Sequence, residues 1–229
     1  MTITWFGQSC FRIEVPIRGR RIEDPRSAGP IGTKAVSILI DPFSPDIGLK
    51  PPKIKDDLVL VTHEHYDHNN TEGAGPETFI IRTPGEYEKN SIAVRGIHSY
   101  HDKTQGKERG PNTIYVIKAE DMILCHLGDL GQEKLDDKQV EEIGDVDILF
   151  VPVGGNYTIN GKEAVEVISQ IEPKIVIPMH YKTKDRKVEM EGPEKFVKEL
   201  GLTPEKVEKF KIAKKMLPTE ELKLVMFTL

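Results

Sequence analysis

Runs of apolar residues alternate with short polar stretches along this chain, and most of the runs have the length of a strand. Residues 2–15 alternate and are rich in Ile, Phe and Val, which predicts β structure. The run DLVLVT at 57–62 has no polar alternation, which indicates a strand covered on both faces. Further strands are predicted at 35–41, 78–83, 91–100, 113–119, 122–128, 147–154, 174–181 and 222–229.

Helical patterns appear mainly in the second half of the chain, at 138–144, 162–171 and 192–201. The segment 207–216, VEKFKIAKKM, fits either a helix or a bent edge strand, and a Pro/Gly/Arg-rich loop is predicted at 16–33. Strands that come first, followed by helices alternating with strands, predict a layered α/β fold in which helices cover buried sheets. Because no long linker or short-period repeat interrupts the pattern, residues 1–229 are expected to form a single domain.

Composition narrows the functional classes. The chain has 229 residues, 30% of them charged, a net charge of -5 and a pI of about 5.9, so no nucleic-acid partner is predicted. The basic cluster at 18–26 is expected to be a surface loop. Cys10 and Cys125 lie in apolar segments, which predicts buried free thiols and a reducing compartment. With no signal-peptide pattern and no run near the roughly 20 apolar residues of a membrane span, a cytoplasmic location without a membrane partner is expected.

The stretch HEHYDH at 63–68 concentrates candidate ligands directly after the apolar run 57–62. In α/β sheets, ligands bind beyond the carboxyl ends of strands. His63 and His65 are two residues apart and would point the same way in an extended loop, while Asp67 and His68 can face another point. Imidazole and carboxylate suit zinc, iron or manganese, so a metal site is predicted. The alternative is a polar surface loop that caps a helix.

Other predicted strands also end in possible ligands. Asp129 follows 122–128, and His180 lies at the end of 174–181. Near 91–100 both His98 and His101 are candidates, and the spacing leaves the choice open. His126 falls inside a predicted strand, so packing or hydrogen bonding is the expected role for it.

Taken together, these residues resemble the signature of metallo-β-lactamase-fold hydrolases. The superfamily pattern HxHxDH is present as HEHYDH, and a following His101, Asp129 in LGD and a late His180 complete the set. The resemblance covers nearly the whole chain. The sequence is most similar to small prokaryotic Zn-dependent hydrolases that share the stretches TWFGQSCFRI, LIDPF, TPGEYE, RGPNT, HLGDLG, VPVGG and PMHY. That branch is related to ascorbate-phosphate lactonases and, more distantly, to N-acyl-phosphatidylethanolamine phospholipases.

This resemblance implies a four-layer αββα sandwich with a metal site at one rim of the sheets. It also implies two divalent ions, zinc first and manganese or iron otherwise. The first ion would be held by His63, His65 and His101, the second by Asp67, His68 and His180, and Asp129 would bridge them. Asp41 in LIDPF would support a ligand histidine, although an acid before Pro42 is also a common turn former.

The implied activity is hydrolysis of an ester, lactone or phosphodiester bond of a small molecule by a metal-bound hydroxide, with Asp67 orienting the nucleophile and taking its proton. His68 argues against a β-lactam substrate, since true β-lactamases of this fold have another residue there. The chain is expected to be too short for the extra nuclease, helical glyoxalase or flavin domains of other branches. The competing hypothesis is a metal-binding sensor or scaffold without turnover, and a homo-oligomer is compatible with either.

Several further polar groups are candidates for the pocket wall, with a surface or turn role as the alternative. They are residues 85–88 (GEYE), Arg109, Asn112, Tyr157 and Tyr181. The glycines of VPVGGNYT at 151–158 would let a backbone approach a ligand closely, and a phosphate cradle there is a weaker hypothesis.

Overall fold

Two β-sheets face each other in the computed structural model, which describes residues 1–16, 35–184 and 189–229. The strands of the six-stranded sheet, in spatial order, are β13 (Phe210–Lys211), β1 (Thr2–Trp5), β2 (Phe11–Pro16), β3 (Ala35–Ile40), β4 (Leu58–Leu60) and β5 (Phe79–Ile81). The eight-stranded sheet has the order β12 (Glu205–Val207), β14 (Lys223–Phe227), β11 (Ile175–Met179), β10 (Ile148–Pro152), β9 (Met122–His126), β8 (Pro111–Ala119), β7 (Ile92–Tyr100) and β6 (Gly85–Lys89). Both sheets mix parallel and antiparallel pairs.

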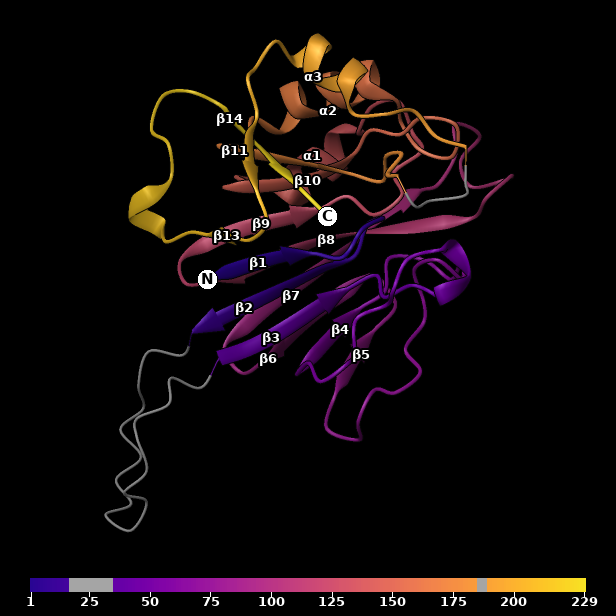
Figure 1. Cartoon of the computed structure of the whole chain (residues 1–229), viewed down its shortest axis with the longest axis vertical. Helices are drawn as coiled ribbons and strands as arrows, with labels where there is room; N and C mark the ends of the chain where they lie inside the picture. Colours follow the sequence, from indigo (N-terminus) through magenta and orange to yellow (C-terminus); the bar gives the residue numbers. More distant parts are fainter. Residues whose placement is uncertain (17–34, 185–188) are drawn as a thin grey trace.

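Three α-helices cover the eight-stranded sheet on the side of β10 and β11, opposite β3 and β4 (Figure 1). They are α1 (Asp137–Ile143), α2 (Gly161–Ile171) and α3 (Glu194–Leu200), and they confirm the helices predicted near these positions. Helix α2 begins at Asn160, whose side chain accepts hydrogen bonds from two backbone N–H groups of the first turn, in a capping box with Glu163. Its buried face, made by Ala164, Val167, Ile168 and Ile171, fixes which way the helix lies.

Within the described ranges, the outer face of the six-stranded sheet is covered by the segment that follows β3, and not by α-helices. Leu39, Val59 and Val61 point to this face and pack with Phe43 and Ile47 from the segment that follows β3. This segment contains only a short 3-10 helix, η1 (Pro45–Ile47), because the prolines at 42, 45, 51 and 52 interrupt any longer helix. The predicted sandwich is therefore confirmed, but in the described part of the chain the layer over this sheet is an irregular segment instead of an α-helix.

The main core lies between the two sheets. Alternate residues of β3, such as Ile38 and Ile40, face inward, and the rings of Phe11 and Phe150 from opposite sheets have centroids 4.7 Å apart. Each such fully buried side chain contributes about 1.5–3 kcal/mol relative to an exposed one. The Tyr115 hydroxyl donates across the core to the Val61 carbonyl at 2.9 Å, which joins the two sheets where β4 ends. The prediction that 57–62 is buried on both faces is confirmed.

Three predicted elements needed correction. Residues 2–15 form two strands, because the chain reverses after β1 at Gly7, whose φ of 98° favours glycine. Residues 85–89 form the edge strand β6, which the polar sequence GEYEK did not predict. For 207–216 the bent edge strand is the correct alternative: β12 pairs with β14 in one sheet, and β13 pairs with β1 in the other, before a second 3-10 helix, η2 (Lys214–Met216).

Two further expectations concern the loop at 16–33 and membrane-spanning helices. The loop predicted at 16–33 and its basic cluster lie outside the described residues, except for Pro16 at the end of β2. Among the helices of the described ranges, none has the length and apolar character that crossing a membrane requires.

Candidate metal centre

The polar residues singled out in the sequence meet at one rim of the sandwich because the strands that precede them run in the same direction. Strands β3 and β4 are parallel neighbours, as are β9, β10 and β11. Strand β7 is two antiparallel steps from β9 and therefore shares its direction. The carboxyl ends of these strands lead into Asp41, the HEHYDH stretch, His101, Asp129 and His180.

Asp129 lies at the centre of the cluster. Its Oδ2 atom is 3.0 Å from His180 Nε2 and 3.1 Å from His68 Nε2. The same oxygen is 3.5 Å from His101 Nε2 and 3.9 Å from His63 Nε2. Four imidazoles from three strand ends therefore converge on one buried carboxylate oxygen.

The ligand atoms also form compact groups. Within each group the candidate nitrogen and oxygen atoms lie within 4.8 Å of one another, and the groups are His63, His65 and His101; Asp67, His68 and His180; and His63, His68 and Asp129. All seven residues proposed from the sequence are thus brought together. Their role as metal ligands stays a prediction.

The protonation states of the histidines suit a metal. His63 is packed against three other imidazoles, with ring centroids 4.2 Å from His68, 4.6 Å from His65 and 4.7 Å from His101. Burial, reinforced by neighbouring histidines, holds the pKa of His63 well below its usual range and lowers the pKa of His101 to about 4. Neutral imidazole is the form that binds metals.

An unpartnered atom supports the same conclusion. His63 Nε2 is buried without a hydrogen-bond partner in the described structure, although buried polar atoms are nearly always paired. This nitrogen belongs to the groups whose ligand atoms converge around Asp129. A divalent ion would use the lone pair of this nitrogen, so the residues present fit the metal that the sequence predicts.

His68 is the exception among the imidazoles. Burial alone would lower its pKa, but Asp129 and Asp41 outweigh that effect and raise the pKa well above its ordinary value. Burial likewise opposes ionisation of Asp129, but His180 and His68 hold the pKa of that carboxyl well below its usual range. The two pKa shifts have opposite signs, as expected when His68 and Asp129 attract one another.

Asp41 supports His68, as the resemblance implied. Its Oδ2 lies 3.0 Å from His68 Nδ1, and its two oxygens accept hydrogen bonds of 2.8 Å from the Thr62 backbone N–H and hydroxyl. The backbone of Asp41 has a φ of 48°, but no turn is assigned at this position, so the alternative turn role gains no support. These contacts direct Nε2 of His68 toward Asp129.

Two residues of the site were not found from the sequence. Gln8 donates from Nε2 to Asp67 Oδ2 at 2.7 Å and lies 3.2 Å from His68 Nε2, while its backbone carbonyl accepts from the His180 N–H. Ser9 donates to Asp129 Oδ1 at 3.2 Å. The signal was a buried polar pair inside the apolar stretch WFGQSCF, which lies within the β structure predicted for residues 2–15.

The two candidate histidines near the end of β7 lie in different surroundings. His98 is exposed on β7, with its ring against Tyr100, whereas His101 is buried in the cluster, so the geometry favours His101. His126 is buried inside β9 and lies 3.0 Å from the Ser9 carbonyl, which confirms the expected packing and hydrogen-bonding role.

A pocket of about 330 Å³ opens over the cluster. It is lined by His65, Tyr66, Asp67, His101, Arg109, Asp129, Tyr157 and His180. Arg109 and Tyr157 thus reach the pocket as expected, but the other polar candidates do not line it. Residues 85–88 belong to the edge strand β6, Asn112 accepts from the Asp129 backbone N–H behind the site, and Tyr181 packs against Trp5.

The glycine-bearing segment after β10 packs closely against the backbone that carries His180. A Cβ atom on Gly154 would lie 2.1 Å from the His180 carbonyl oxygen, so only glycine lets these two segments pass. The close approach predicted for this stretch is therefore made to the chain that carries His180, and the weaker phosphate-cradle hypothesis gains no support from it.

Comparison with known proteins agrees with this geometry. Residues 2–180 match the Beta-lactamase superfamily domain. A crystal structure from Thermotoga maritima is described as that of a candidate Zn-dependent hydrolase of the metallo-beta-lactamase superfamily. It superposes on this chain with a TM-score of 0.76 and 34% sequence identity, and the match covers 99% of this chain and 97% of that one. The chain belongs to the metallo-beta-lactamase superfamily.

Relatives of this superfamily member carry the name UPF0173. A UPF0173 protein of Pyrococcus abyssi is 32% identical over 80% of this chain and 84% of its own length. A UPF0173 metal-dependent hydrolase of Thermoplasma acidophilum is 30% identical over 81% of this chain and 85% of its own length. The resemblance to small hydrolases of this superfamily is confirmed, whereas the relation to ascorbate-phosphate lactonases stays a prediction.

Proposed function

We propose that this chain is a metal-dependent hydrolase with a dinuclear site that cleaves an ester, lactone or phosphodiester bond of a small molecule. The hydrolase class follows the family, whose members include named metal-dependent hydrolases. The observation that carries the dinuclear site is the convergence of four histidines on Asp129 Oδ2, together with the two separate ligand groups His63, His65 and His101, and Asp67, His68 and His180.

The proposed ligands divide as the family resemblance implies. His63, His65 and His101 would hold one ion, Asp67, His68 and His180 the other, and Asp129 both. When bound, two divalent ions, zinc first and manganese or iron otherwise, would supply hydroxide near neutral pH by lowering the pKa of a shared water from about 16 toward about 7.

The chain's own residues prepare the reaction. Ser9 and the Asn112 side chain fix Asp129 through its carboxylate and its backbone N–H. Asp67 lines the pocket and is oriented by Gln8, which places its carboxylate where it can hold the attacking water and accept its proton. The partly exposed Asp67 is therefore the group proposed to move a proton.

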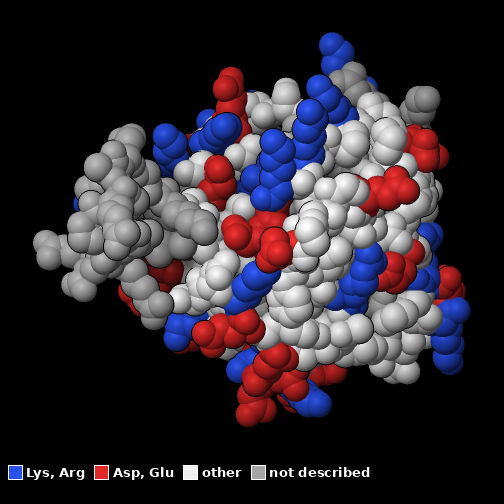
Figure 2. All heavy atoms as spheres, turned by 90° about the horizontal axis from the view of Figure 1, so that it is seen from below, with Lys and Arg blue, Asp and Glu red and all other residues white. Residues whose placement is uncertain are grey.

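The pocket supports a small-molecule substrate. Its volume of about 330 Å³ is at the lower end of the range for small ligands. Figure 2 shows Lys and Arg interspersed with Asp and Glu on the face viewed from below. The size of the pocket is the observation that favours a small-molecule partner.

A metal titration and a substrate screen test the proposal. We expect about two equivalents of metal per chain by elemental analysis, and turnover of at least one lactone, ester or phosphodiester with zinc, manganese or iron. His63→Ala should lose metal and activity, whereas the matched control His98→Ala, at an exposed histidine outside the cluster, should keep both. Protein that binds no metal would contradict the proposal, and full metal content without any turnover would favour the sensor or scaffold instead.

A further inference from the structure

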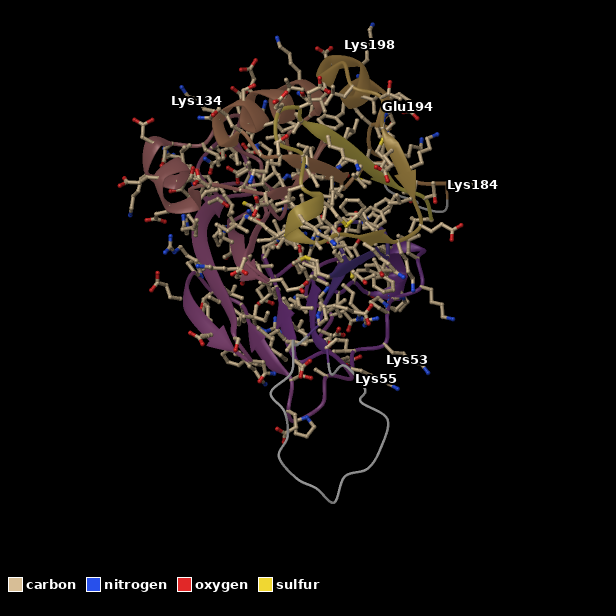
Figure 3. All side chains as sticks on the ribbon, turned by 90° about the vertical axis from the view of Figure 1, so that its left-hand side faces the viewer. Lys53, Lys55, Lys134, Lys184, Glu194 and Lys198 are labelled. Carbon is tan, nitrogen blue, oxygen red and sulfur yellow. The ribbon has the colours of Figure 1, made fainter. Side chains whose placement is uncertain are left out.

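Arg109 brings a positive charge into the wall of the pocket. Among the described residues that line the pocket it is the one Lys or Arg, and its side chain is half-buried. Lysines such as Lys134 and Lys198 project outward at the periphery instead (Figure 3). A long cationic side chain kept at a binding pocket needs an explanation, because most lysines and arginines hold their charge in bulk water.

The backbone that carries Arg109 is fixed relative to the metal centre. Asp102, the neighbour of His101, accepts hydrogen bonds from the backbone N–H groups of Arg109 at 2.8 Å and Glu108 at 3.0 Å. The same carboxylate accepts from the backbone N–H groups of Thr104 and Gly106, each at 2.8 Å. One carboxylate thus accepts hydrogen bonds from four backbone N–H groups of the segment 104–109. These bonds fix the backbone of Arg109 relative to Asp102, the neighbour of His101.

The guanidinium contacts an aromatic ring and, among the described residues, no acid. Its central carbon lies 4.5 Å from the centroid of the Tyr157 ring, a cation–π contact. In the described part of the chain no carboxylate is within ion-pair distance of Arg109, and its side-chain N–H groups form no hydrogen bond. The two carboxylates that line the pocket, Asp67 and Asp129, engage the histidines of the cluster.

We propose that Arg109 and Tyr157 form a subsite for an anionic group of the substrate, a carboxylate or a phosphate, beside the metal centre. This inference rests on the proposed hydrolase function and names the class of its substrate. The guanidinium presents a rigid fork of donors that matches carboxylate and phosphate oxygens, and the Tyr157 ring holds this fork in place. The Tyr157 hydroxyl can add a further donor. The substrate would therefore place its scissile bond at the cluster and its anionic group at Arg109.

Dicarboxylates test the subsite without knowledge of the natural substrate. One carboxylate can occupy the metal centre while the other reaches Arg109, so we would measure binding of malonate, succinate, glutarate and adipate to the zinc-loaded protein by calorimetry. Each is compared with the monocarboxylate of equal chain length. At least one dicarboxylate should bind 10-fold or more tightly than its partner, and Arg109→Gln should abolish that preference. Arg109→Lys should retain part of it, because it keeps the charge and loses the fork.

Controls separate this inference from its premises. Lys107→Gln removes an exposed charge from the same turn and should leave the preference unchanged. If Arg109→Gln does not fold, Tyr157→Leu gives a second test and should weaken the preference at least threefold. No preference in the wild-type protein, or an equal preference in Arg109→Gln, would overturn the subsite. Absence of bound zinc in the starting protein would instead overturn the proposed function.

Discussion

Nδ1 of His68 lies 3.0 Å from Oδ2 of Asp41, and this contact leaves Nε2 of the same imidazole to face Asp129. Both side chains are fully buried. Such a carboxylate–histidine pair fixes the tautomer and the ring orientation of a metal-binding histidine. We expect the Asp41–His68 pair to fix the orientation of the His68 ring before any ion binds.

Replacing Asp41 tests this role. Asp41→Asn keeps the shape and tolerates the φ of 48°, but it removes the charge beside His68. We expect metal affinity to fall about 10–100-fold, measured by competition with a chromophoric chelator. The matched control Asp46→Asn changes an exposed acid of the same segment and should not alter affinity. Equal affinities for Asp41→Asn and the wild type would show that the pair does not prepare the site.

Gln8 offers a second test of how the cluster is held. Gln8→Ala removes the hydrogen bond to Asp67 and the contact with His68, both in the group proposed for the second ion. We expect one step of a two-site zinc titration to lose about 10-fold in affinity, as for other groups that orient metal ligands, while the other step changes little. A uniform loss in both steps, or none, would contradict the division of ligands between the two ions.

Metal removal should lower thermal stability. Zinc at about 1,000 times its dissociation constant adds about 4 kcal/mol to the free energy of unfolding if the unfolded chain does not bind it. For a chain of this size about 2–4 °C corresponds to 1 kcal/mol, so we expect the Tm to rise by about 8–16 °C when zinc is added to chelated protein. Magnesium, which prefers oxygen ligands, should give a much smaller shift. Scanning calorimetry of the wild type and His63→Ala distinguishes binding at the cluster from nonspecific binding.

The position of Gly154 predicts a steric effect on the site. Gly154→Ala would bring its Cβ atom to 2.1 Å from the His180 carbonyl oxygen, so one of the two backbones must move. We expect a loss of about 1–3 kcal/mol in the free energy of unfolding, together with weaker metal binding because His180 shifts. Gly75→Ala is the control, since a Cβ atom there meets nothing within 4 Å. Urea unfolding of both variants gives the comparison, and equal stabilities would show that the contact is relieved without cost.

Asp147 predicts a pH dependence away from the metal centre. Burial opposes its ionisation, but hydrogen bonds from Lys174, the Ile123 N–H and Lys214 lower its pKa below the ordinary value. A carboxyl with a depressed folded-state pKa stabilises the protein above its unfolded pKa of about 3.9, and this contribution is lost as the pH falls through the lower, folded-state value.

Asp147→Asn should therefore destabilise the protein at pH 7, by about 1–2 kcal/mol because both lysines remain partly exposed, and by less near pH 3. Urea unfolding at the two pH values measures the difference. Asp145→Asn, at an exposed acid two residues away, should change little at either pH. A cost for Asp147→Asn that is equal at pH 3 and pH 7 would contradict the assignment.

The chain's local patterns predicted most strands and all three helices, because apolar periodicity reports directly on burial. They failed where tertiary pairing decides the structure. The polar segment GEYEK becomes the edge strand β6 because β7 offers it a partner. Residues 205–211 divide between two sheets because β14 and β1 each present a free edge. The reversal at Gly7 was missed because the apolar residues on both sides continue the same alternation.

The sequence by itself determined the superfamily and predicted the metal centre: the HEHYDH stretch, Asp129 and His180 are ligand types that suit a metal, and each follows a predicted strand after a short spacing. Only the tertiary structure showed that His101, and not His98, lies in the cluster, added Gln8 and Ser9, and placed Arg109 in the wall of the pocket. These outcomes depend on which strand ends share a rim and which way each side chain turns. Contacts between residues distant in the chain fix both, and no local pattern records them.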